Sequence, residues 1–308
     1  MDPKKTLVLD KEETALFEEQ TTFVQTKVYE TKHKALKALQ VFSVNREVPS
    51  GTETIEWRYI DEVGSAKIIA DYAKDFPNVD LYVKKVTGKV RGIGNMYQYT
   101  VPEIRRGQLA GVALDTKRAV AAKKFHDVTH DNIAWKGDAD FGLQGFIGYP
   151  GNTEVVLAAG ASTSKTWALK TSLEIIADFR TLKSAGSTLT SGRETYDTIL
   201  MPQEQYDLIE GTPMSAENDK TILTYLKETY PNITLWMGLT ELNGAGAGGL
   251  DRIYYFNRDA EHVEYVIPQD FEQMDPDKQG MAYQTVCHSE SGGIIEYYPT
   301  AVLWADGI

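Results

Sequence analysis

The sequence predicts a mixed α+β fold. Strand-like and helix-like segments are interspersed along the 308 residues without a regular alternating unit, which argues against a doubly wound parallel sheet. Hydrophobic residues make up 42% of the chain and charged residues 25%, as is usual for globular proteins. At roughly 150 residues per domain, the length suggests about two domains.

Residues 1–50 are predicted to form an N-terminal arm, because their apolar residues are sparse. Asp10 followed by Glu13 resembles a capping box, so a charged helix is expected to begin there. Such a segment buries little surface by itself, and we expect it to pack on a neighbour.

Residues 51–100 are predicted to form an extended two-stranded loop. Ile55–Ile60, Tyr82–Val86 and Ile93–Thr100 are strand-like, and glycines punctuate the returning half. An isolated two-stranded ribbon is marginally stable in water, so this one is expected to need a partner surface.

The remaining chain is predicted to contain several helices, with glycine stops at Gly137, Gly186 and Gly211. The apolar face of the second helix is expected to hold Leu169, Leu173, Ile176 and Leu182. The predicted helices are Pro102–Trp135, most regular from Leu114, then Ser164–Ser184, Pro202–Glu210, and one capped by Asn218 that stops before Pro231.

Short apolar runs between these helices predict strands. The predicted strands are Asp197–Met201, Thr234–Met237, Asp251–Phe256, His262–Ile267, Tyr283–Cys287 and Ile294–Tyr298.

The net charge of −12 is unevenly distributed. Residues 1–50 are neutral, residues 51–135 carry +2 and residues 136–308 carry −14. Opposite charges on the two halves would suit head-to-tail contacts between copies, whereas an acidic half also serves solubility alone. Both interpretations stay open on charge alone.

Cys287 is the single cysteine, so no intramolecular disulfide is expected and a reducing compartment is indicated. No apolar stretch approaches the roughly 20 residues that span a bilayer, and no secretory signal is recognised at the N-terminus. A cytosolic, acidic protein without membrane association is therefore expected.

Gly244, Gly246 and Gly249 match the spacing of a dinucleotide-binding loop. That mechanism requires a helix directly after the glycines, because the pyrophosphate binds at the helix N-terminus. The following residues, 250–256, are strand-like instead. We therefore expect a plain glycine loop, and a nucleotide-dependent enzyme is the rival hypothesis that dinucleotide titration would test.

His126 and His130 stand one helical turn apart and approach the zinc motif H-E-x-x-H, but Asp127 replaces its glutamate and no third ligand is evident. Surface histidines are expected. Cys287 and His288 would point to opposite faces of a strand. No catalytic constellation or cofactor site emerges, so no enzyme is expected.

Three basic dipeptides, Lys84-Lys85, Arg105-Arg106 and Lys123-Lys124, could touch phosphates. The net charge and the lack of a long basic face argue against specific DNA binding, and leave only weak, non-specific contact.

An ordered series of segments resembles the major capsid proteins of tailed bacteriophages, in the branch that is also similar to encapsulin shell proteins. The resemblance covers roughly residues 55–308. Its segments are Tyr59–Ala70, Asp75–Asp80, Gly92–Tyr99, Glu103–Arg106, Leu114–Ala122, Gly137–Phe146 and Gly292–Pro299.

The resemblance implies a tile of an icosahedral head shell that encloses double-stranded DNA. Residues 1–50 would be the N-terminal arm and residues 51–100 the extended loop, lying across the adjacent subunit. Residues 101–152 and 274–308 would form the peripheral domain with its long spine helix, to which the last strand returns. Residues 153–273 would form the axial domain, with a candidate axial tip containing Asn243, Gly244, Gly246, Gly248 and Gly249.

The implied partners are further copies of the chain in hexamers and pentamers, a separate scaffolding protein, a portal, a decoration protein and packaged DNA. The implied location is the virion, with assembly in the host bacterial cytoplasm. The alternative is an encapsulin-like compartment shell. No lysine–asparagine cross-link is predicted. The residues predicted to contact a neighbouring subunit are Trp57, Arg58, Lys84, Lys85 and Arg91. Of these, Lys84, Lys85 and Arg91 are expected to approach acidic groups of that subunit.

Overall fold

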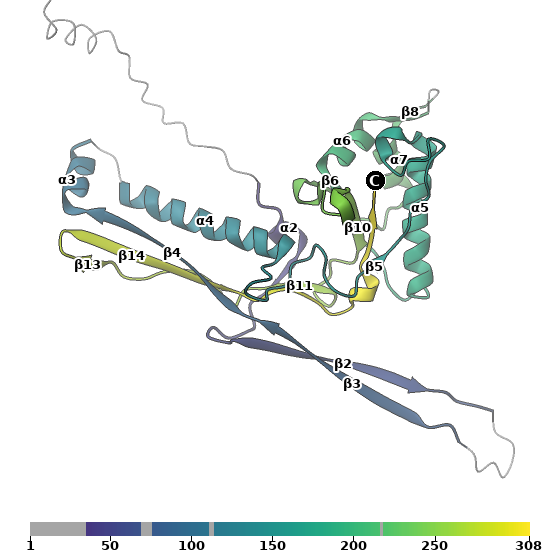
Figure 1. The fold of residues 1–308 in the computed structure, drawn as a ribbon, viewed down its shortest axis with the longest axis horizontal. Coiled ribbons are helices and arrows are strands. Elements are labelled where there is room, and N and C mark those ends of the chain that lie inside the picture. Colours follow the sequence, from purple (N-terminus) through teal and green to yellow (C-terminus); the bar gives the residue numbers. More distant parts are fainter. Residues whose placement is uncertain (1–34, 69–75, 111–113, 216–217) are drawn as a thin grey trace, which may run out of the picture. The chain divides into compact units, whose positions relative to one another are not determined.

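The computed structural model describes residues 35–68, 76–110, 114–215 and 218–308 (Figure 1). The helix predicted to begin at Asp10 lies outside these residues. The helices are α2 Ala38–Val41, α3 Val101–Ala110, α4 Leu114–Lys136, α5 Ser172–Leu189, α6 Gln203–Gly211 and α7 Ile222–Thr229, with 3-10 turns at Trp167–Leu169, Thr240–Leu242, Ala247–Gly249 and Pro299–Ala301. No helix in these ranges has the length and apolar character that crossing a bilayer requires.

The strands form several sheets, and the mixed α+β prediction is confirmed. They are β1 Ser43–Asn45, β2 Thr54–Gly64, β3 Val79–Lys89, β4 Arg91–Thr100, β5 Thr153–Glu154, β6 Thr198–Pro202, β7 Pro213–Ser215, β8 Asn218–Thr221, β9 Leu235–Leu239, β10 Arg252–Phe256, β11 Val263–Val266, β12 Gln269–Gln273, β13 Asp277–Gln279, β14 Ala282–Ser291, β15 Gly293–Glu296 and β16 Leu303–Asp306.

A five-stranded sheet in the order β5-β16-β10-β6-β9 has a hydrophobic core on each face. Side chains alternate between the two faces of a strand, so Ile253 and Tyr255 enter one core while Tyr254 and Phe256 enter the other. This two-sided burial explains why β6 and β10 are buried at every position and read as continuous apolar runs.

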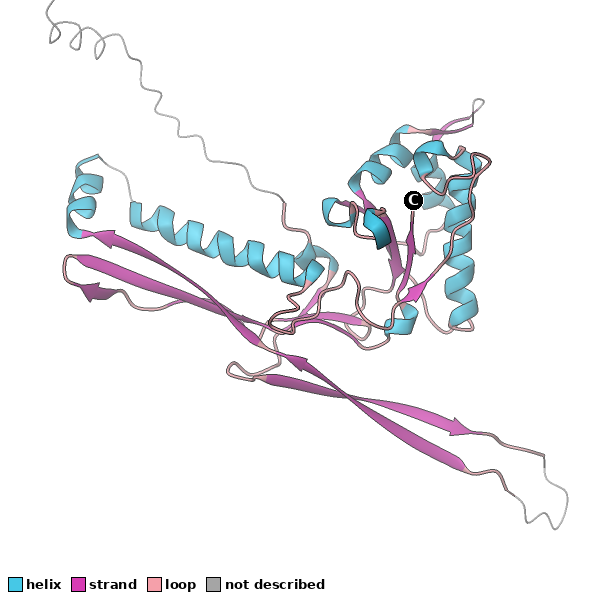
Figure 2. Cartoon of the chain, in the orientation of Figure 1, coloured by secondary structure: helices cyan, strands magenta, loops and turns pink. Residues whose placement is uncertain are grey.

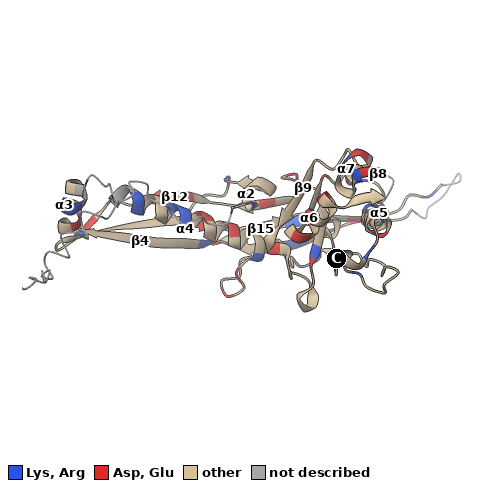
Figure 3. Cartoon of the chain, turned by 90° about the horizontal axis from the view of Figure 1, so that it is seen from above, with Lys and Arg blue, Asp and Glu red and all other residues tan. Residues whose placement is uncertain are grey.

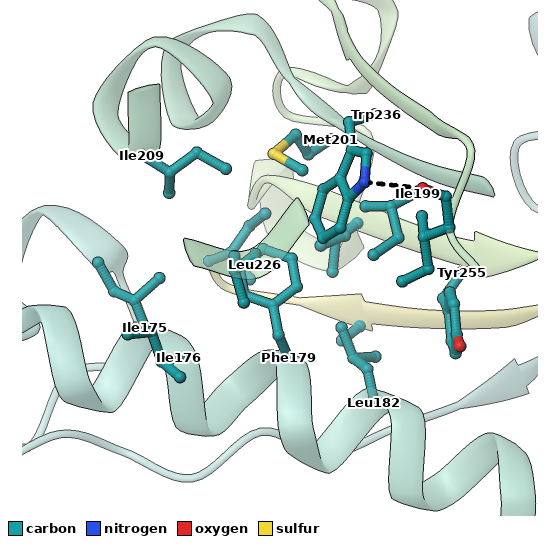
Figure 4. Packing of buried hydrophobic residues seen from close by; sticks show 14 of the residues in the cluster. Ile175, Ile176, Phe179, Leu182, Ile199, Met201, Ile209, Leu226, Trp236 and Tyr255 are labelled. Atoms are coloured by element: carbon teal, nitrogen blue, oxygen red, sulfur yellow. Dashed lines mark hydrogen bonds between the residues drawn. The ribbon is translucent and has the colours of Figure 1, made fainter. Parts of the chain in front are cut away.

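The first core lies between this sheet and helices α5–α7. In Figure 4, Phe179 and Leu182 point from α5 toward Trp236 and Ile199 of the sheet. The indole Nε1 of Trp236 donates a hydrogen bond to the carbonyl of Ile233 at 3.2 Å, which satisfies the only polar group of this buried ring.

The second core joins the other face of the sheet to the C-terminal end of α4 and to α2. Phe42 packs against Trp135 and Phe146, with ring centroids 5.0 Å apart in both pairs. The carboxylate of Asp131 on α4 accepts the backbone N–H groups of Lys37 and Ala38, at 3.0 and 2.8 Å. Residues 38–45 are therefore part of a core of their own subunit, and the prediction that all of residues 1–50 form an arm is wrong for them.

The predicted extended loop is shorter than expected. β2 pairs with β3 from Thr54–Lys89 to Gly64–Val79 and forms a two-stranded ribbon (Figure 2). β4 instead pairs along its whole length with β14, in the sheet that also holds β12 and β13. Ile93–Thr100 is thus a strand, as predicted, but it does not belong to the ribbon.

The last strand also departs from expectation. β16 pairs with β10 and β5, so residues 303–306 lie in the five-stranded sheet with the strands of residues 153–273. Conversely, β11 pairs with β15, and β12 pairs with β14. The expected return of the last strand to the peripheral domain is therefore wrong.

Two helix starts were misplaced. α5 begins at Ser172, eight residues after the predicted start, because Glu174 accepts the backbone N–H of Thr171 at 2.8 Å and closes a capping box. Leu169 and Leu173 are exposed, and the helix continues through Gly186. α7 begins after Thr221, whose hydroxyl accepts the N–H of Thr224, so Asn218 is not its cap.

The end of α4 was predicted correctly. Gly137 has φ +68°, a conformation that side chains with a Cβ rarely adopt, and its N–H closes the last turn on Ile133 at 2.8 Å. A Cβ at this position would lie 2.5 Å from the backbone nitrogen of Gly145. The long helix therefore stops where the chain turns back against itself.

Candidate assembly surfaces

The ribbon of β2 and β3 exposes large apolar side chains. Directly opposed residues of an antiparallel pair share a face, so Ile60 and Val83 lie together beside Leu81 and Val79. These four residues, here called the ribbon strip, are 60–68% exposed. Val63 and Tyr82 are exposed on the opposite face. A contiguous apolar surface of this kind marks a site of protein–protein contact.

Both long edges of the ribbon are open within the described part of the chain. β2 and β3 pair only with each other, so each strand has one row of backbone N–H and C=O groups without a strand partner. Such edges are able to pair with another chain. The ribbon thus offers both apolar side chains and backbone hydrogen-bonding groups.

The base of the ribbon is fixed to its own subunit. The Trp57 indole donates to the Tyr59 hydroxyl at 3.1 Å, and this hydroxyl donates to the carbonyl of Glu296 at 2.9 Å. The rings of Trp57 and Tyr297 meet edge to face at 6.5 Å. Trp57 therefore contacts its own subunit, while the strip further along the ribbon stays uncovered.

The predicted basic contact residues lie in different surroundings. Lys85 pairs with Glu56 at 2.5 Å and Arg58 pairs with the same carboxylate at 3.4 Å, which together hold the pKa of Glu56 below its usual value, mainly through the hydrogen bond from Lys85. Lys84 is exposed on the other face of the ribbon. Arg91 lies in β4 and donates to the carbonyl of Phe141 at 3.2 Å. Their contact with a neighbouring subunit stays a prediction.

Sequence reasoning named the charged residues of the ribbon but not the strip. The signal was present, because Val79, Leu81 and Val83 alternate with polar or aromatic residues in a segment bounded by Pro77 and Gly88. Alternation predicts that one face is buried, although no surface within the described ranges covers it.

The glycine loop is held in place by carboxylates. The backbone N–H of Gly244 donates to Asp251 at 2.9 Å and that of Ala247 donates to Asp306 at 2.8 Å. Asp306 also pairs with Arg252, at 2.6 Å. Asn243, Gly248 and Gly249 are exposed, and Gly246 lies against Asp306, with no room for a Cβ.

The loop lacks the geometry of a dinucleotide site. After Gly249 the chain enters β10, as the sequence predicted, so no helix N-terminus is available there for a pyrophosphate. In the described ranges, no three His, Cys, Asp or Glu side chains are grouped closely enough to hold a metal ion.

The two histidines of α4 are buried, so the expectation of surface histidines is wrong. His126 Nδ1 lies 2.7 Å from the Ser289 hydroxyl on β14, and His130 Nε2 lies 3.1 Å from the same oxygen. His130 Nδ1 bonds the hydroxyl of Tyr265 on β11 at 2.8 Å. Burial, aided by His126, lowers the pKa of His130 to about 4. These side chains fix α4 to the sheets.

A buried carboxyl lies at the ribbon base. Glu296 has no exposed surface, its Oε1 accepts a long hydrogen bond from Asn152 at 3.4 Å, and burial raises its pKa well above the usual value. Its backbone carbonyl accepts from Tyr59. The base of the ribbon is therefore hydrogen-bonded to the backbone of a fully buried residue.

The fold matches those of solved capsid structures. The capsid of Myoviridae Phage XM1 superposes with a TM-score of 0.79 at 18% identity, over 94% of this chain and 98% of that one. The capsid of a native GTA particle gives 0.67 at 11% identity, over 97% and 99%. A virus-like particle from Pyrococcus furiosus gives 0.55 at 13% identity, over 87% and 91%.

At the level of sequence, no curated protein matches this chain. The family described as "Major capsid protein" matches residues 64–308, which is most of the chain and includes β3, β4, α4 and the five-stranded sheet. The resemblance stated from the sequence is thereby confirmed. The chain belongs to the major capsid protein family of tailed bacteriophages.

Proposed function

We propose that this major capsid protein assembles with copies of itself into the icosahedral head shell of a tailed bacteriophage, around double-stranded DNA. The observation that carries the proposal is the ribbon strip, whose side chains are more than half exposed on strands with open edges. A subunit that works alone gains nothing from such a surface, whereas a shell subunit requires lateral contacts.

The energetics support a contact role for the strip. Burying a Val, Leu or Ile side chain fully contributes about 1.5–3 kcal/mol relative to leaving it exposed, before the costs of association. Each ribbon carries four such side chains, so their burial would contribute this free energy at every boundary between subunits of a closed shell. We propose that the ribbon lies across the adjacent subunit, as the extended loop of the family.

The remaining elements are assigned by the same reasoning. α4 and the sheet of β4, β12, β13 and β14 would form the peripheral domain, with α4 as its spine helix. The five-stranded sheet with α5–α7 would form the axial domain, with residues 243–249 at its tip. Arg58, Lys84, Lys85 and Arg91 would face acidic groups of a neighbouring copy, in keeping with the excess negative charge of residues 136–308.

The role is structural, without catalysis. A scaffolding protein, a portal and a decoration protein would be its partners, and assembly would occur in the host bacterial cytoplasm. An encapsulin-like compartment shell is the alternative, and the matched family favours the phage shell. Shells purified from the natural host would contain DNA under the proposal and a protein cargo under the alternative.

The experiment compares two variants of the strip in the purified full chain. Leu81→Ser with Val83→Ser removes apolar surface, whereas Leu81→Ile with Val83→Ile keeps it. Negative-stain microscopy and light scattering over a concentration series should show shells, tubes or rings for the wild type and for the isoleucine variant. The serine variant should need at least a tenfold higher concentration, equivalent to about 1.4 kcal/mol per contact.

Assembly of the serine variant at the wild-type concentration would overturn the role of the strip. A wild-type chain that stays monomeric at every concentration, with and without DNA, would overturn the proposed function itself.

A further inference from the structure

Basic residues recur along α3 and α4 (Figure 3). Arg105, Arg106, Lys117 and Lys123 are exposed, and Lys124 is half-buried. None of the five makes an ion pair within the described part of the chain. We call them the basic face. Of the acidic side chains on the same helices, Glu103 pairs with Arg118, and Asp127, one turn after Lys123, is half-buried, which raises its pKa.

The helix geometry aligns the lysines. Lys117 and Lys124 are seven residues apart, close to two turns, so both lie on the same side of α4. The opposite side of the helix is buried on the sheet. Its residues Ala122 and His126 contact Asn95 and Ser289, at 3.0 and 2.7 Å. The lysines therefore point away from β4 and β14.

The other side of the same layer is acidic. Asn95 and Ser289 are odd-numbered positions that face α4, so the even-numbered positions of β4 and β14 and the residues paired with them face away. Glu290 lies on that outer side, with Glu272 opposite His288 and Asp277 opposite Gln284. The helix–sheet layer is thus basic on one surface and acidic on the other.

Such a layer orients a polyanion. The chain carries −12 overall, so phosphates are repelled from most of its surface and are attracted where cations are concentrated. Neutralising phosphates with Lys and Arg releases counterions from DNA, which provides sequence-independent affinity that falls with salt. A shell surface that faces packaged DNA requires this sequence-independent affinity for phosphates, which involves no contact with the bases.

We propose that the basic face of α3 and α4 binds the phosphate backbone of the packaged DNA and that this surface lines the interior of the shell. The inference rests on the proposed function, since it takes DNA as the content of the shell. It assigns the contact to Arg105, Arg106, Lys117, Lys123 and Lys124, and it excludes the outer side of the sheet.

The test measures binding of a short fluorescent DNA duplex to the purified full chain, below the concentration at which shells form. Fluorescence anisotropy over a salt series gives the dependence of log K on log salt. Lys117→Gln with Lys124→Gln is compared with Lys165→Gln with Lys227→Gln, two exposed lysines outside α3 and α4. Both double variants change the net charge equally, so only position differs.

The basic-face variant should bind more weakly than the control, and the slope of log K against log salt should become shallower by about 2. The control should match the wild type. Equal losses in both variants, or no salt-dependent binding by the wild type, would overturn the inference. Shell formation is scored separately, so shells with unaltered DNA binding would refute the basic face while leaving the proposed function intact.

Discussion

β10 and β3 are both rich in residues that favour strands, yet they place them in opposite environments. All five residues of β10 are buried, because β6 and β16 flank the strand and a core covers each face. β3 has β2 as its neighbour, and its apolar residues Val79, Leu81 and Val83 are exposed. The difference shows that neighbouring strands, not strand propensity, decide burial. The five-stranded sheet therefore stabilises the subunit, whereas the ribbon is available for contact with another copy.

The largest expected effect is a cavity in the buried sheet. Phe256→Ala should destabilise the subunit by about 3–5 kcal/mol, because Phe256 is fully buried and packs against Phe42 and Phe146. Urea unfolding of the monomer measures this loss. A cost below about 1 kcal/mol would break the comparison, since β10 would then carry no more of the stability than the ribbon does.

The second effect is a pH dependence of the joint between α4 and the sheets. Burial lowers the pKa of His130 from 6.5 to about 4, so the unfolded chain binds a proton in this range while the folded chain does not. Stability should therefore fall as the pH drops from about 7 to 4, by about 3 kcal/mol from this residue. Asp270 opposes the shift, and His126 adds to it.

His130→Gln keeps hydrogen-bonding groups without titrating in this range. Its unfolding free energy should change less between these pH values than that of the wild type. If the unfolding free energies of the two proteins changed equally with pH, His130 would not be the titrating group.

A smaller effect concerns the start of α5. Glu174 accepts the backbone N–H groups of Thr171 and Ala161, at 2.8 and 2.7 Å. Glu174→Ala leaves both N–H groups without this partner and should lower the midpoint of thermal or urea unfolding. Glu228→Ala is the control, because it breaks only an exposed ion pair with Lys220 and should cost less than about 0.5 kcal/mol. Equal costs would contradict the assigned cap.

The smallest effect on the subunit is expected in the ribbon. Leu81→Ala with Val83→Ala should change the unfolding free energy of the monomer by less than about 0.5 kcal/mol, because both side chains are already exposed. A loss comparable to that of Phe256→Ala would mean that the strip packs on its own subunit in solution.

Local sequence patterns predicted the strands of the buried sheet well, since short continuous apolar runs such as residues 252–256 are typical of strands that are covered on both faces. They failed where the partner lies far away along the chain. β4 pairs with β14, about 190 residues later, and no local pattern could separate β4 from the ribbon that precedes it. His126 and His130 looked like surface residues because the strands that cover them lie 163 and 135 residues further along the chain.

Apolar residues alone predicted the wrong start for α5. Leu169 and Leu173 suggested an early start of α5, whereas the start is set by the backbone hydrogen bonds of Glu174, and both leucines are exposed. The ribbon was predicted as a contact element, but its apolar strip was overlooked in favour of its charges. The alternation of Val79, Leu81 and Val83 marks one apolar face, and the register with β2 adds Ile60 to it.

The central claim is that the ribbon strip is bare in the subunit and covered in the shell. Leu81→Cys introduces a thiol there, while the single native cysteine, Cys287, is buried. Maleimide labelling of this variant is measured in dilute monomer and in assembled shells. We expect fast labelling of the monomer and at least tenfold slower labelling of the shell, and equal rates in both states would contradict the claim.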